Sequence, residues 1–510
     1  MLNNLPSEEL GTSSAGQPRN VNLLQKSNTT VNATNKKSNA QQAENSTNNN
    51  KNLIFSKYLV SLMSTLNLNN SNSPSPSVSY NTQKLLNSSS NSSNSVTSNN
   101  RADQKEQQGP QVIKFRTSLR NTVYQVMKDR GWKETDSDLD WDFFWADVHW
   151  VHETFDHVYL QEHQKINHFR NHYELTRKDL LVKNVKRMIK TVEKEYGKHE
   201  SQKFEFITTS YVLPQEHALF QEEFKRNPGS IWIMKPVGRA QGKGIFLINK
   251  MSQISQWKKD PRSGGMYNQN SINSNGEKST QVEEPEAYIV QKYIENPYLI
   301  GGKKFDIRCY ALVISYYPLV VYIHRNGFCR FSNFQFSMNV KDISNLYIHA
   351  TNVAIQKTSP NYDGDKGCKW LLRNLKNYLL SKHEHQKVND LFTEMEALIV
   401  RSLMSVQKVM INDKHCFELY GYDILIDENL KPWCLEVNAS PSLTAETQFD
   451  YDLKHAMLND CFDVVDFEKR YTADKTKLRA KVGGFDLVYN DGPVKHEKAS
   501  YYSSYLGIPN

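Results

Sequence analysis

The hydrophobic residues of this chain recur with two spacings, one typical of helices and one typical of strands. Between residues 176 and 197 they recur every three or four positions, after a Thr-x-x-Asp start and before a glycine, which predicts a helix. A second helical pattern covers about 386–411. Apolar runs that predict strands occupy 231–237, 244–248, 287–294, 305–314, 319–325, 417–427 and 433–437. Strands mixed with helices favour an α/β or α+β fold.

The first hundred residues lack this patterning. They contain 23 Asn and 21 Ser, a composition that predicts a disordered arm over 1–110. Seven Trp and Phe residues then fall between 115 and 150, a density that requires a hydrophobic core. The Gly/Asn/Ser-rich stretch 261–285 predicts a flexible surface insertion, and 467–510 predicts a mostly disordered, weakly basic tail.

Charge and cysteine content restrict the partner and the compartment. Lys and Arg number 63 against 55 Asp and Glu, and the net charge of +8 suits an acidic partner: nucleic acid, tubulin tails or an anionic membrane. The six cysteines are scattered without a C-x-x-C, which indicates reduced thiols in a cytosolic protein. An apolar stretch long enough to span a membrane is missing from the sequence, so we expect no membrane span.

A glycine-rich segment joins two predicted strands. Residues 235–244 read Lys-Pro-Val-Gly-Arg-Ala-Gln-Gly-Lys-Gly. Glycine lets a backbone approach phosphates closely, and Lys and Arg neutralise them. No Ser or Thr follows Lys243, so the segment is not a P-loop. A hairpin that closes over a nucleotide fits it better, and an ordinary hairpin turn is the alternative.

Three oxygen-bearing side chains lie on two otherwise apolar strands. Glu436 and Asn438 are two positions apart and therefore face the same side, and Asp423 lies on the preceding strand. A carboxylate on a buried strand is costly unless it is paired or binds a metal. Such ligands suit Mg²⁺, whereas the alternative is that they cap turns at strand ends.

A charged face alternates with an apolar one in the run 304–308. Lys304, Asp306 and Arg308 share one face, and Arg325 lies on the next predicted strand. Two arginines on neighbouring strands could clamp one carboxylate, although a solvated sheet surface is the simpler interpretation.

Two further segments suggest site loops. In 349–357, the polar residues include Thr351 and Asn352, which could instead cap a helix. The segment 288–294 leaves a strand for a loop, an arrangement that can offer backbone groups to an adenine edge.

Together, these segments resemble the tubulin–tyrosine-ligase-like family, ATP-grasp enzymes that ligate amino acids to tubulin. The resemblance covers about 115–466, and the block Asn-His-Tyr-Glu-Leu-Thr-Arg-Lys at 171–178 looks most like the polyglutamylase branch. Arg170 stands where the family usually has Pro. The other matching motifs are Trp-Ile-Met-Lys-Pro at 232–236, Gly-Lys-Gly-Ile-Phe at 242–246, Gln-Lys-Tyr-Ile at 291–294, Lys-Phe-Asp-Ile-Arg at 304–308, His-Ala-Thr-Asn at 349–352 and Leu-Glu-Val-Asn-Ala-Ser-Pro-Ser-Leu at 435–443.

The resemblance implies a fold and a division of the chain. The fold would be of the ATP-grasp type, with ATP held between two mixed β-sheet subdomains and a smaller N-terminal α/β subdomain. Within a catalytic region at 111–466, the expected divisions are 111–215, 216–300 and 301–466.

The resemblance also implies roles for individual residues. Lys304, Asp306 and Arg308 would be catalytic, Thr351 and Asn352 would line the reaction centre, and Arg308 and Arg325 would bind the α-carboxylate of the incoming amino acid. Mg²⁺ would be bound by Asp423, Glu436 and Asn438. The residues implied for ATP are Lys178, Lys235, Arg239, Gln241, Gly242, Gly244, Gln291, Lys292, Tyr293, Ile294, Lys304 and Asp306.

The activity implied is addition of glutamate, through an acylphosphate, to glutamate side chains in the acidic C-terminal tails of tubulin. The partners would be microtubules and free glutamate but not nucleic acid, and a need for accessory subunits stays open. The location would be cytoplasm and cytoskeleton, in a cilium axoneme or basal body. The alternatives are a glycylase or tyrosine ligase of the same family, an ATP-grasp ligase with another acceptor, and an inactive microtubule-binding scaffold.

Overall fold

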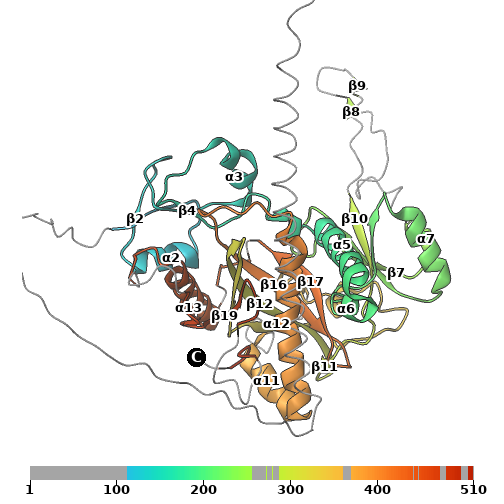
Figure 1. Ribbon diagram of the computed structural model, residues 1–510. Coiled ribbons are helices and arrows are strands. Elements are labelled where there is room, and N and C mark those ends of the chain that lie inside the picture. The colour runs from blue at the N-terminus through green and yellow to red at the C-terminus, as the bar shows by residue number, and fades with distance from the viewer. Residues whose placement is uncertain are drawn as a thin grey trace, which may run out of the picture. The chain divides into compact units, whose positions relative to one another are not determined.

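The computed structural model describes residues 112–254, 271–272, 278–279, 287–359, 369–439, 441–445, 447–470, 478–494 and 504–508 (Figure 1). The arm predicted over 1–110 lies outside the described residues. The insertion predicted over 261–285 does so too, apart from the paired strands β8 (Ser271–Ile272) and β9 (Lys278–Ser279). Of the helices that the structure describes, none is long and apolar enough to cross a bilayer.

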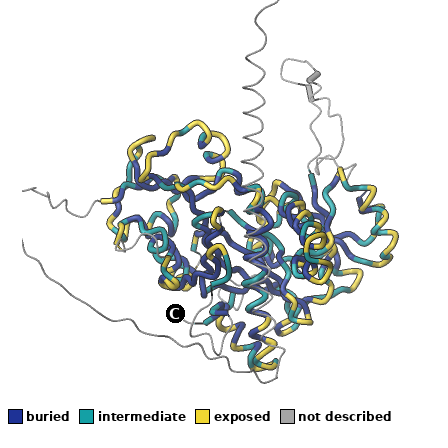
Figure 2. Tube along the Cα trace, viewed as in Figure 1, coloured by how far each residue is buried: buried dark blue, intermediate teal, exposed yellow. Residues whose placement is uncertain are grey.

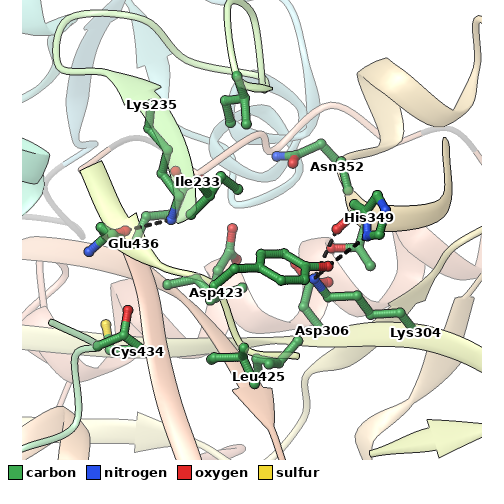
Figure 3. Close-up of a pocket in the computed structure, with 18 of the residues that line it drawn as sticks. Ile233, Lys235, Lys304, Asp306, His349, Asn352, Asp423, Leu425, Cys434 and Glu436 are labelled. Carbon is green, nitrogen blue, oxygen red and sulfur yellow. Dashed lines mark hydrogen bonds between the residues drawn. The ribbon is translucent and has the colours of Figure 1, made fainter. Parts of the chain in front are cut away.

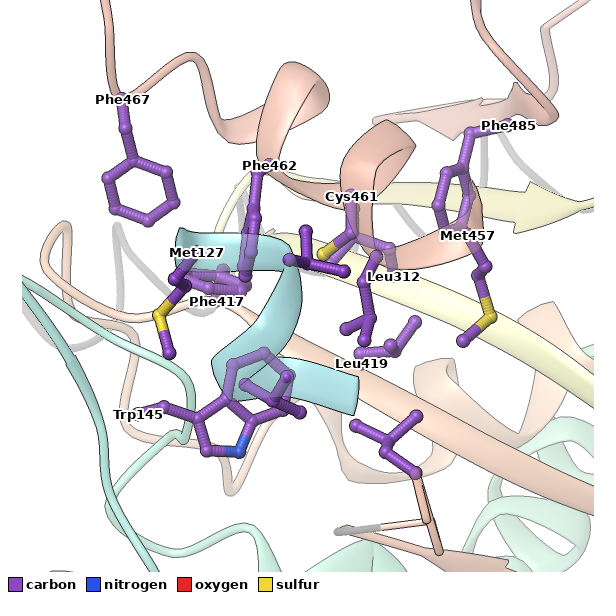
Figure 4. Close-up of a cluster of buried hydrophobic side chains, with 14 of the residues drawn as sticks. Met127, Trp145, Leu312, Phe417, Leu419, Met457, Cys461, Phe462, Phe467 and Phe485 are labelled. Atoms are coloured by element: carbon purple, nitrogen blue, oxygen red, sulfur yellow. The ribbon is translucent and has the colours of Figure 1, made fainter. Parts of the chain in front are cut away.

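A small parallel sheet, ordered β2-β1-β3-β4, forms the N-terminal part of the described chain. Its aromatic side chains pack with α2 and α13, and Figure 4 shows Trp145, Phe417, Phe462 and Phe467 in this core. The elements are β1 (Lys114–Thr117), α2 (Thr122–Asp129), β2 (Lys133–Glu134), β3 (Phe143–Trp145), α3 (Val148–Glu153), the 3₁₀ turn η1 (Phe155–His157), β4 (Lys165–Ile166) and, much later in the chain, α13 (Gln448–Val465).

Helices then lead into the second sheet: α4 (Tyr173–Thr176), α5 (Lys178–Tyr196) and α6 (Lys198–Gln202). The helix predicted after residue 176 is present as α5, and Gly197, at φ 87°, ends it. The predicted start at Thr176 is wrong. Thr176 ends α4, and its hydroxyl donates back to the carbonyl oxygen of His172 at 3.2 Å, so it does not cap α5.

The central sheet is ordered β5-β10-β6-β7. One face packs against α7 (His217–Arg226) through a core that includes Phe220 and Trp232. Figure 2 shows the strands mostly buried and exposed residues on the outer side of α7. The strands are β5 (Ser210–Leu213), β6 (Trp232–Pro236), β7 (Phe246–Ile248) and β10 (Tyr288–Lys292).

The third sheet has nine strands, organised around the 14-residue strand β12 (Lys303–Tyr316), which pairs with β11, β13, β14 and β16. The others are β11 (Leu299–Ile300), β13 (Leu319–His324), β14 (Phe328–Phe331), β15 (Lys369–Leu371), β16 (Glu418–Ile426), β17 (Pro432–Asn438), β18 (Lys481–Val482) and β19 (Phe485–Asn490). The accompanying helices are α9 (Leu346–His349), α10 (Val353–Gln356), α11 (Leu372–Leu380) and α12 (His385–Gln407), the last confirming the helix predicted at 386–411.

The structure confirms a mixed α/β architecture but corrects the expected sheets. The two larger sheets were expected to be mixed, yet all their described pairs are antiparallel, and the parallel pairs belong to the small sheet. The reason is local, because neighbours such as β12–β13 and β16–β17 are joined by turns too short for a parallel crossover. Strand β5, expected in the part ending at 215, pairs with β10 of the central sheet.

Part of the tail is also ordered. The expectation of a mostly disordered tail does not hold for residues 478–494, which form β18 and β19. The first five residues of β19, from Phe485 to Tyr489, are all buried, and that strand pairs with β13. The sequence signal was a short apolar run, Phe-Asp-Leu-Val-Tyr at 485–489, that lies between polar stretches.

Candidate functional site

A cleft lies where the central sheet meets the nine-stranded sheet (Figure 3). Alternate residues of four strands face it, as the two-residue period of a strand requires: Ile233 and Lys235, Lys304 and Asp306, Asp423 and Leu425, Cys434 and Glu436. The remaining lining residues are Thr208, Ile245, Gln291, Lys292, Tyr293, Ile294, His349, Ala350, Thr351, Asn352 and Leu435. The cleft therefore gathers residues predicted for ATP, for the metal and for the reaction centre.

Lys235 is a buried cation on one wall. Its ammonium donates to Oε1 of Gln291 at 2.8 Å, and the Gln291 amide donates to the Ser210 hydroxyl at 2.9 Å. Burial lowers the pKa of Lys235 to about 8, against the attraction of Glu436. The residue is therefore held in place, mostly protonated near neutral pH, and loses its charge as the pH rises through about 8.

Lys304 belongs to a buried chain of hydrogen bonds. Its ammonium donates to the hydroxyl of Tyr293 and to the carbonyl oxygen of His349, each at 2.9 Å. Nε2 of His349 lies 3.1 Å from the carbonyl oxygen of Asp342, which can only accept, so the ring proton is on Nε2. Nδ1 then accepts from the Tyr293 hydroxyl at 2.9 Å. Burial and the charge of Lys235 lower the pKa of Lys304 to about 7.

Two arginines and two aspartates form a network at the base of the cleft. Arg308 donates to both oxygens of Asp423 at 2.5 and 3.1 Å. Arg330 binds both oxygens of Asp306 and also approaches Asp423 at 2.8 Å. Burial alone would raise the pKa of Asp423, but the two guanidinium groups hold it well below its usual range. Arg308, predicted as catalytic, thus reaches the site through Asp423.

The predicted metal ligands come together on one face. Asp423 lies directly opposite Glu436 across β16–β17, and Asn438 lies opposite Gly421, whose carbonyl oxygen its amide contacts at 3.3 Å. Glu436 is 23% exposed, and Lys178 lies 3.6 Å from it. Among the described residues, no three Asp, Glu, His or Cys side chains gather as a metal site, and the predicted set has only two carboxylates, plus an amide. These are oxygen donors of the kind Mg²⁺ uses.

The glycine-rich loop closes on the same cleft. Gln241, Gly242 and Gly244 have φ values of 62°, 76° and 75°, in the left-handed region. A Cβ atom on Gly242 would lie 3.4 Å from Oδ1 of Asn352, so the loop reaches a residue that lines the cleft. Asn352 takes the N-cap position of α10, as the capping alternative expected of Thr351 or Asn352, but its side chain makes no capping hydrogen bond.

Lys178 and Arg239 stand at the edge of this loop. The ammonium of Lys178 donates to the carbonyl oxygen of Arg239 at 3.1 Å. Neither residue is among those that line the cleft. Lys178 is nevertheless within reach of it, through its contact with Glu436.

Arg325 takes a separate position. It is not among the residues that line the cleft, and its guanidinium binds both oxygens of Asp486 on β19 at 2.6 Å. The two arginines predicted to clamp one carboxylate therefore each hold a different aspartate. Sequence reasoning missed Arg330 and Asp486. The available signal was a charged residue inside an apolar strand, as in Phe-Cys-Arg-Phe at 328–331.

These features define a class: a mixed α/β protein with a cation-rich cleft, flanked by carboxylates, where two antiparallel sheets meet. The family model described as the tubulin-tyrosine ligase family matches residues 154–472. This chain belongs to the tubulin-tyrosine ligase family.

Several curated relatives cover most of the chain. A Bos taurus protein named probable tubulin polyglutamylase TTLL9 is 50% identical over 417 residues, which is 79% of this chain and 89% of the relative. A Tetrahymena thermophila protein named probable alpha-tubulin polyglutamylase Ttll1 is 44% identical, over 75% of this chain and 94% of the relative. Tubulin polyglutamylase TTLL5 of Mus musculus is 34% identical, over 71% of this chain and 26% of the relative.

Proposed function

We propose that this protein is an ATP-dependent ligase that adds glutamate through isopeptide bonds to glutamate side chains in tubulin C-terminal tails. The observation that carries the proposal is the cleft in which Lys235 and Lys304 share one space with Asp423 and Glu436. Buried cations attract phosphates, and the carboxylates suit a divalent cation. The relatives are named tubulin polyglutamylase, and this name is the basis for proposing tubulin as the acceptor and glutamate as the amino acid.

In this proposal the two larger sheets hold ATP between them, as in an ATP-grasp fold. Ile233, Ile245 and Leu425 give the cleft an apolar surface suited to a purine ring. The backbone of 291–294, which lines the same cleft, would meet the adenine edge. Lys235 and Lys304 would neutralise phosphate oxygens, and the glycine-rich loop would cover them.

Asp423, Glu436 and Asn438 would hold Mg²⁺. Their oxygens share one face of β16–β17, although Asp423 also accepts hydrogen bonds from two arginines. The bound ion would neutralise phosphate charge. Arg308 and Arg330 keep Asp423 ionised, which suits a ligand for a cation.

The proposed chemistry has two balanced steps. An oxygen of the acceptor γ-carboxylate attacks the γ-phosphorus of ATP, the bond to ADP breaks, and an acylphosphate forms. The amine of free glutamate then attacks the acyl carbon, phosphate leaves with the C–O electron pair, and the amine loses its proton. Lys235 and Lys304 would stabilise the charge on the phosphoryl oxygens, and no protein nucleophile is needed.

The proposal predicts where the protein acts. Its substrate is a microtubule, so we infer a cytoskeletal location, with cilium axonemes and basal bodies as the specific expectation. A need for accessory subunits would show as ligase activity that is present in cell extract and missing from the purified protein.

Parallel incorporation assays test this function. Purified protein, microtubules, ATP and Mg²⁺ are incubated with labelled glutamate, glycine or tyrosine. We expect glutamate alone to enter tubulin, and removal of its C-terminal tails by subtilisin to abolish the signal. Incorporation of glycine without glutamate would identify a glycylase, and ATP binding without any incorporation, with or without extract, would favour a scaffold.

The lowered lysine pKa values predict a pH dependence for nucleotide binding. Below pH 7 both ammonium groups are charged in the free protein, whereas above pH 8 bound phosphate must recharge them by proton uptake. Affinity for a non-hydrolysable ATP analogue should therefore fall on the order of 10- to 100-fold between about pH 7.5 and about pH 9. Calorimetry in two buffers measures both affinity and proton uptake. The Lys304→Arg variant cannot lose its charge and should show a shallower slope, whereas a flat wild-type profile would contradict the assignment.

A matched pair of glycine substitutions tests the loop. Gly242 and Gly229 have φ values of 76° and 88°, so alanine should cost each about 1 kcal/mol of stability. A Cβ at Gly242 would lie 2.5 Å from Cδ1 of Ile355, while Gly229 has nothing within 4 Å. We expect Gly242→Ala to raise the KM for ATP by roughly tenfold, equivalent to about 1.4 kcal/mol, and Gly229→Ala to leave it unchanged. Equal KM values for ATP in the two variants would show that the loop does not contribute to ATP binding.

A further inference from the structure

The segment Ser504–Ile508 is bound to the body of the protein, although the sequence predicted disorder there. Ser504 and Leu506 are 4% and 2% exposed. The Ser504 hydroxyl donates to Glu396 of α12 at 2.7 Å, and Lys376 of α11 donates to the Leu506 carbonyl oxygen at 2.8 Å. The Leu506 N–H donates to the Ser504 hydroxyl at 3.2 Å, which fixes the segment's local turn.

The surface that receives this segment contains one basic and one acidic side chain, Lys376 and Glu396. Lys376 is 2% exposed, and burial lowers its pKa to about 8. Burial likewise raises the pKa of Glu396 to about 7. Covering such groups is costly unless they are hydrogen-bonded, and the backbone carbonyl and hydroxyl of the segment provide those bonds. The segment therefore supplies hydrogen-bond partners to both side chains that it contacts.

Gly507 brings the segment into contact with Arg325. Its N–H donates to the Arg325 carbonyl oxygen at 2.9 Å. Its φ is +70°, and a Cβ there would lie 3.1 Å from Cε1 of Phe392 and 3.3 Å from Cδ of Lys376. A residue with a side chain would therefore be strained in this backbone conformation, and its side chain would press against the receiving surface.

Tyr505 covers the other side of Arg325. The guanidinium carbon lies 5.4 Å from the centre of the Tyr505 ring, and Nζ of Lys481 lies 4.1 Å from the same ring. The Arg325 N–H donates to the carbonyl oxygen of Gly484 at 2.9 Å, and its side chain is bidentate with Asp486. Arg325 is thus fixed by β19 from one direction and by Ser504–Ile508 from another.

We propose that Ser504–Ile508 is a positioning element for substrate binding, which folds back onto α11 and α12 and sets the orientation of Arg325. The inference rests on the proposed function and adds to it the role that the family resemblance implies for Arg325, binding of the α-carboxylate of free glutamate beside the cleft. Asp486 takes Nε and Nη2 of this guanidinium, so the substrate would be met by Nη1. A charged hydrogen bond from one guanidinium nitrogen depends on the direction of the side chain, so a displacement of about 1 Å is costly. The segment acts through Arg325 and has no part in ATP binding.

The first test deletes residues 504–510 and measures steady-state kinetics with tubulin. We expect the KM for glutamate to rise at least about tenfold, while the KM for ATP stays within about twofold of wild type. Gly507→Val in the full chain should reproduce this split, and deletion of 509–510 alone is the matched control. Unchanged glutamate KM, or a parallel rise in both KM values with loss of the thermal transition, overturns the proposal.

The second test is independent of catalysis. A fluorescent peptide Ser-Tyr-Leu-Gly-Ile-Pro-Asn is titrated into the deleted protein, and anisotropy reports binding. We expect saturation at about 1 mM or below, no binding to the full chain, and partial recovery of glutamate KM on adding peptide. A peptide with Val in place of Gly, and the Lys376→Met variant of the deleted protein, should both fail to bind. If wild type ligates nothing yet the peptide binds, the proposed function has failed and the docking has not; absence of peptide binding overturns the docking itself.

Discussion

Glu436→Gln is expected to lower the rate of glutamate incorporation by at least about 100-fold. The substitution keeps the shape of the side chain and removes one negative charge from the face shared with Asp423 and Asn438. The affinity for Mg²⁺ should fall accordingly, so the Mg²⁺ concentration needed for half-maximal rate should rise. The protein should remain folded, because the side chain is 23% exposed and its ion pair with Lys178 is long, at 3.6 Å.

The matched control is Glu428→Gln. Glu428 is exposed in the turn between the same two strands and accepts a hydrogen bond from the Asn296 amide at 3.0 Å. Its substitution should leave the rate within about twofold of wild type and the melting temperature unchanged. Direct Mg²⁺ titration by calorimetry, with a bound ATP analogue, separates loss of metal from loss of chemistry. Wild-type turnover by Glu436→Gln would show that the metal assignment is wrong.

The sequence predicted those features of the site that depend on residues close together in the chain. Alternation along one strand is local, so the pairing of Lys304 with Asp306 on one face could be read directly. The same rule places Glu436 and Asn438 together. Motif resemblance then linked strands that are far apart in the chain, and the cleft does bring many of those residues together.

What could not be read is the register between strands. Asp306 lies opposite Arg330 only because β12 and β14 pair with one particular alignment, and a shift by one residue would turn Arg330 to the other face. The pairing of Arg325 with Asp486 likewise depends on β19, a strand far along the chain. Composition had assigned that region to a disordered tail, because a six-residue strand contributes little to the average of its surroundings.

The buried Arg–Asp network should make Arg330→Met strongly destabilising, by about 3–5 kcal/mol in the free energy of unfolding. Arg330 is the partner that binds both oxygens of Asp306, and Asp306 is only 2% exposed. Its removal leaves a carboxylate in the interior without a matching charge. Denaturant unfolding, followed by fluorescence, measures the change, and Arg373→Met on the exposed side of α11 should stay within about 0.5 kcal/mol of wild type.

Two further measurements separate the charge effect from simple loss of packing. Adding Asp306→Asn to Arg330→Met removes the unmatched charge and should recover part of the lost stability, whereas a packing defect would remain. The second measurement is the dependence of stability on pH in the acid range. Asp423 has a lowered pKa in the folded state, so its contribution is present above its usual pKa of 3.8 and is lost as pH falls through the lowered value. Without Arg330 that pKa rises, and acid unfolding should begin at higher pH; an unchanged acid midpoint would mean that Arg308 alone keeps Asp423 ionised.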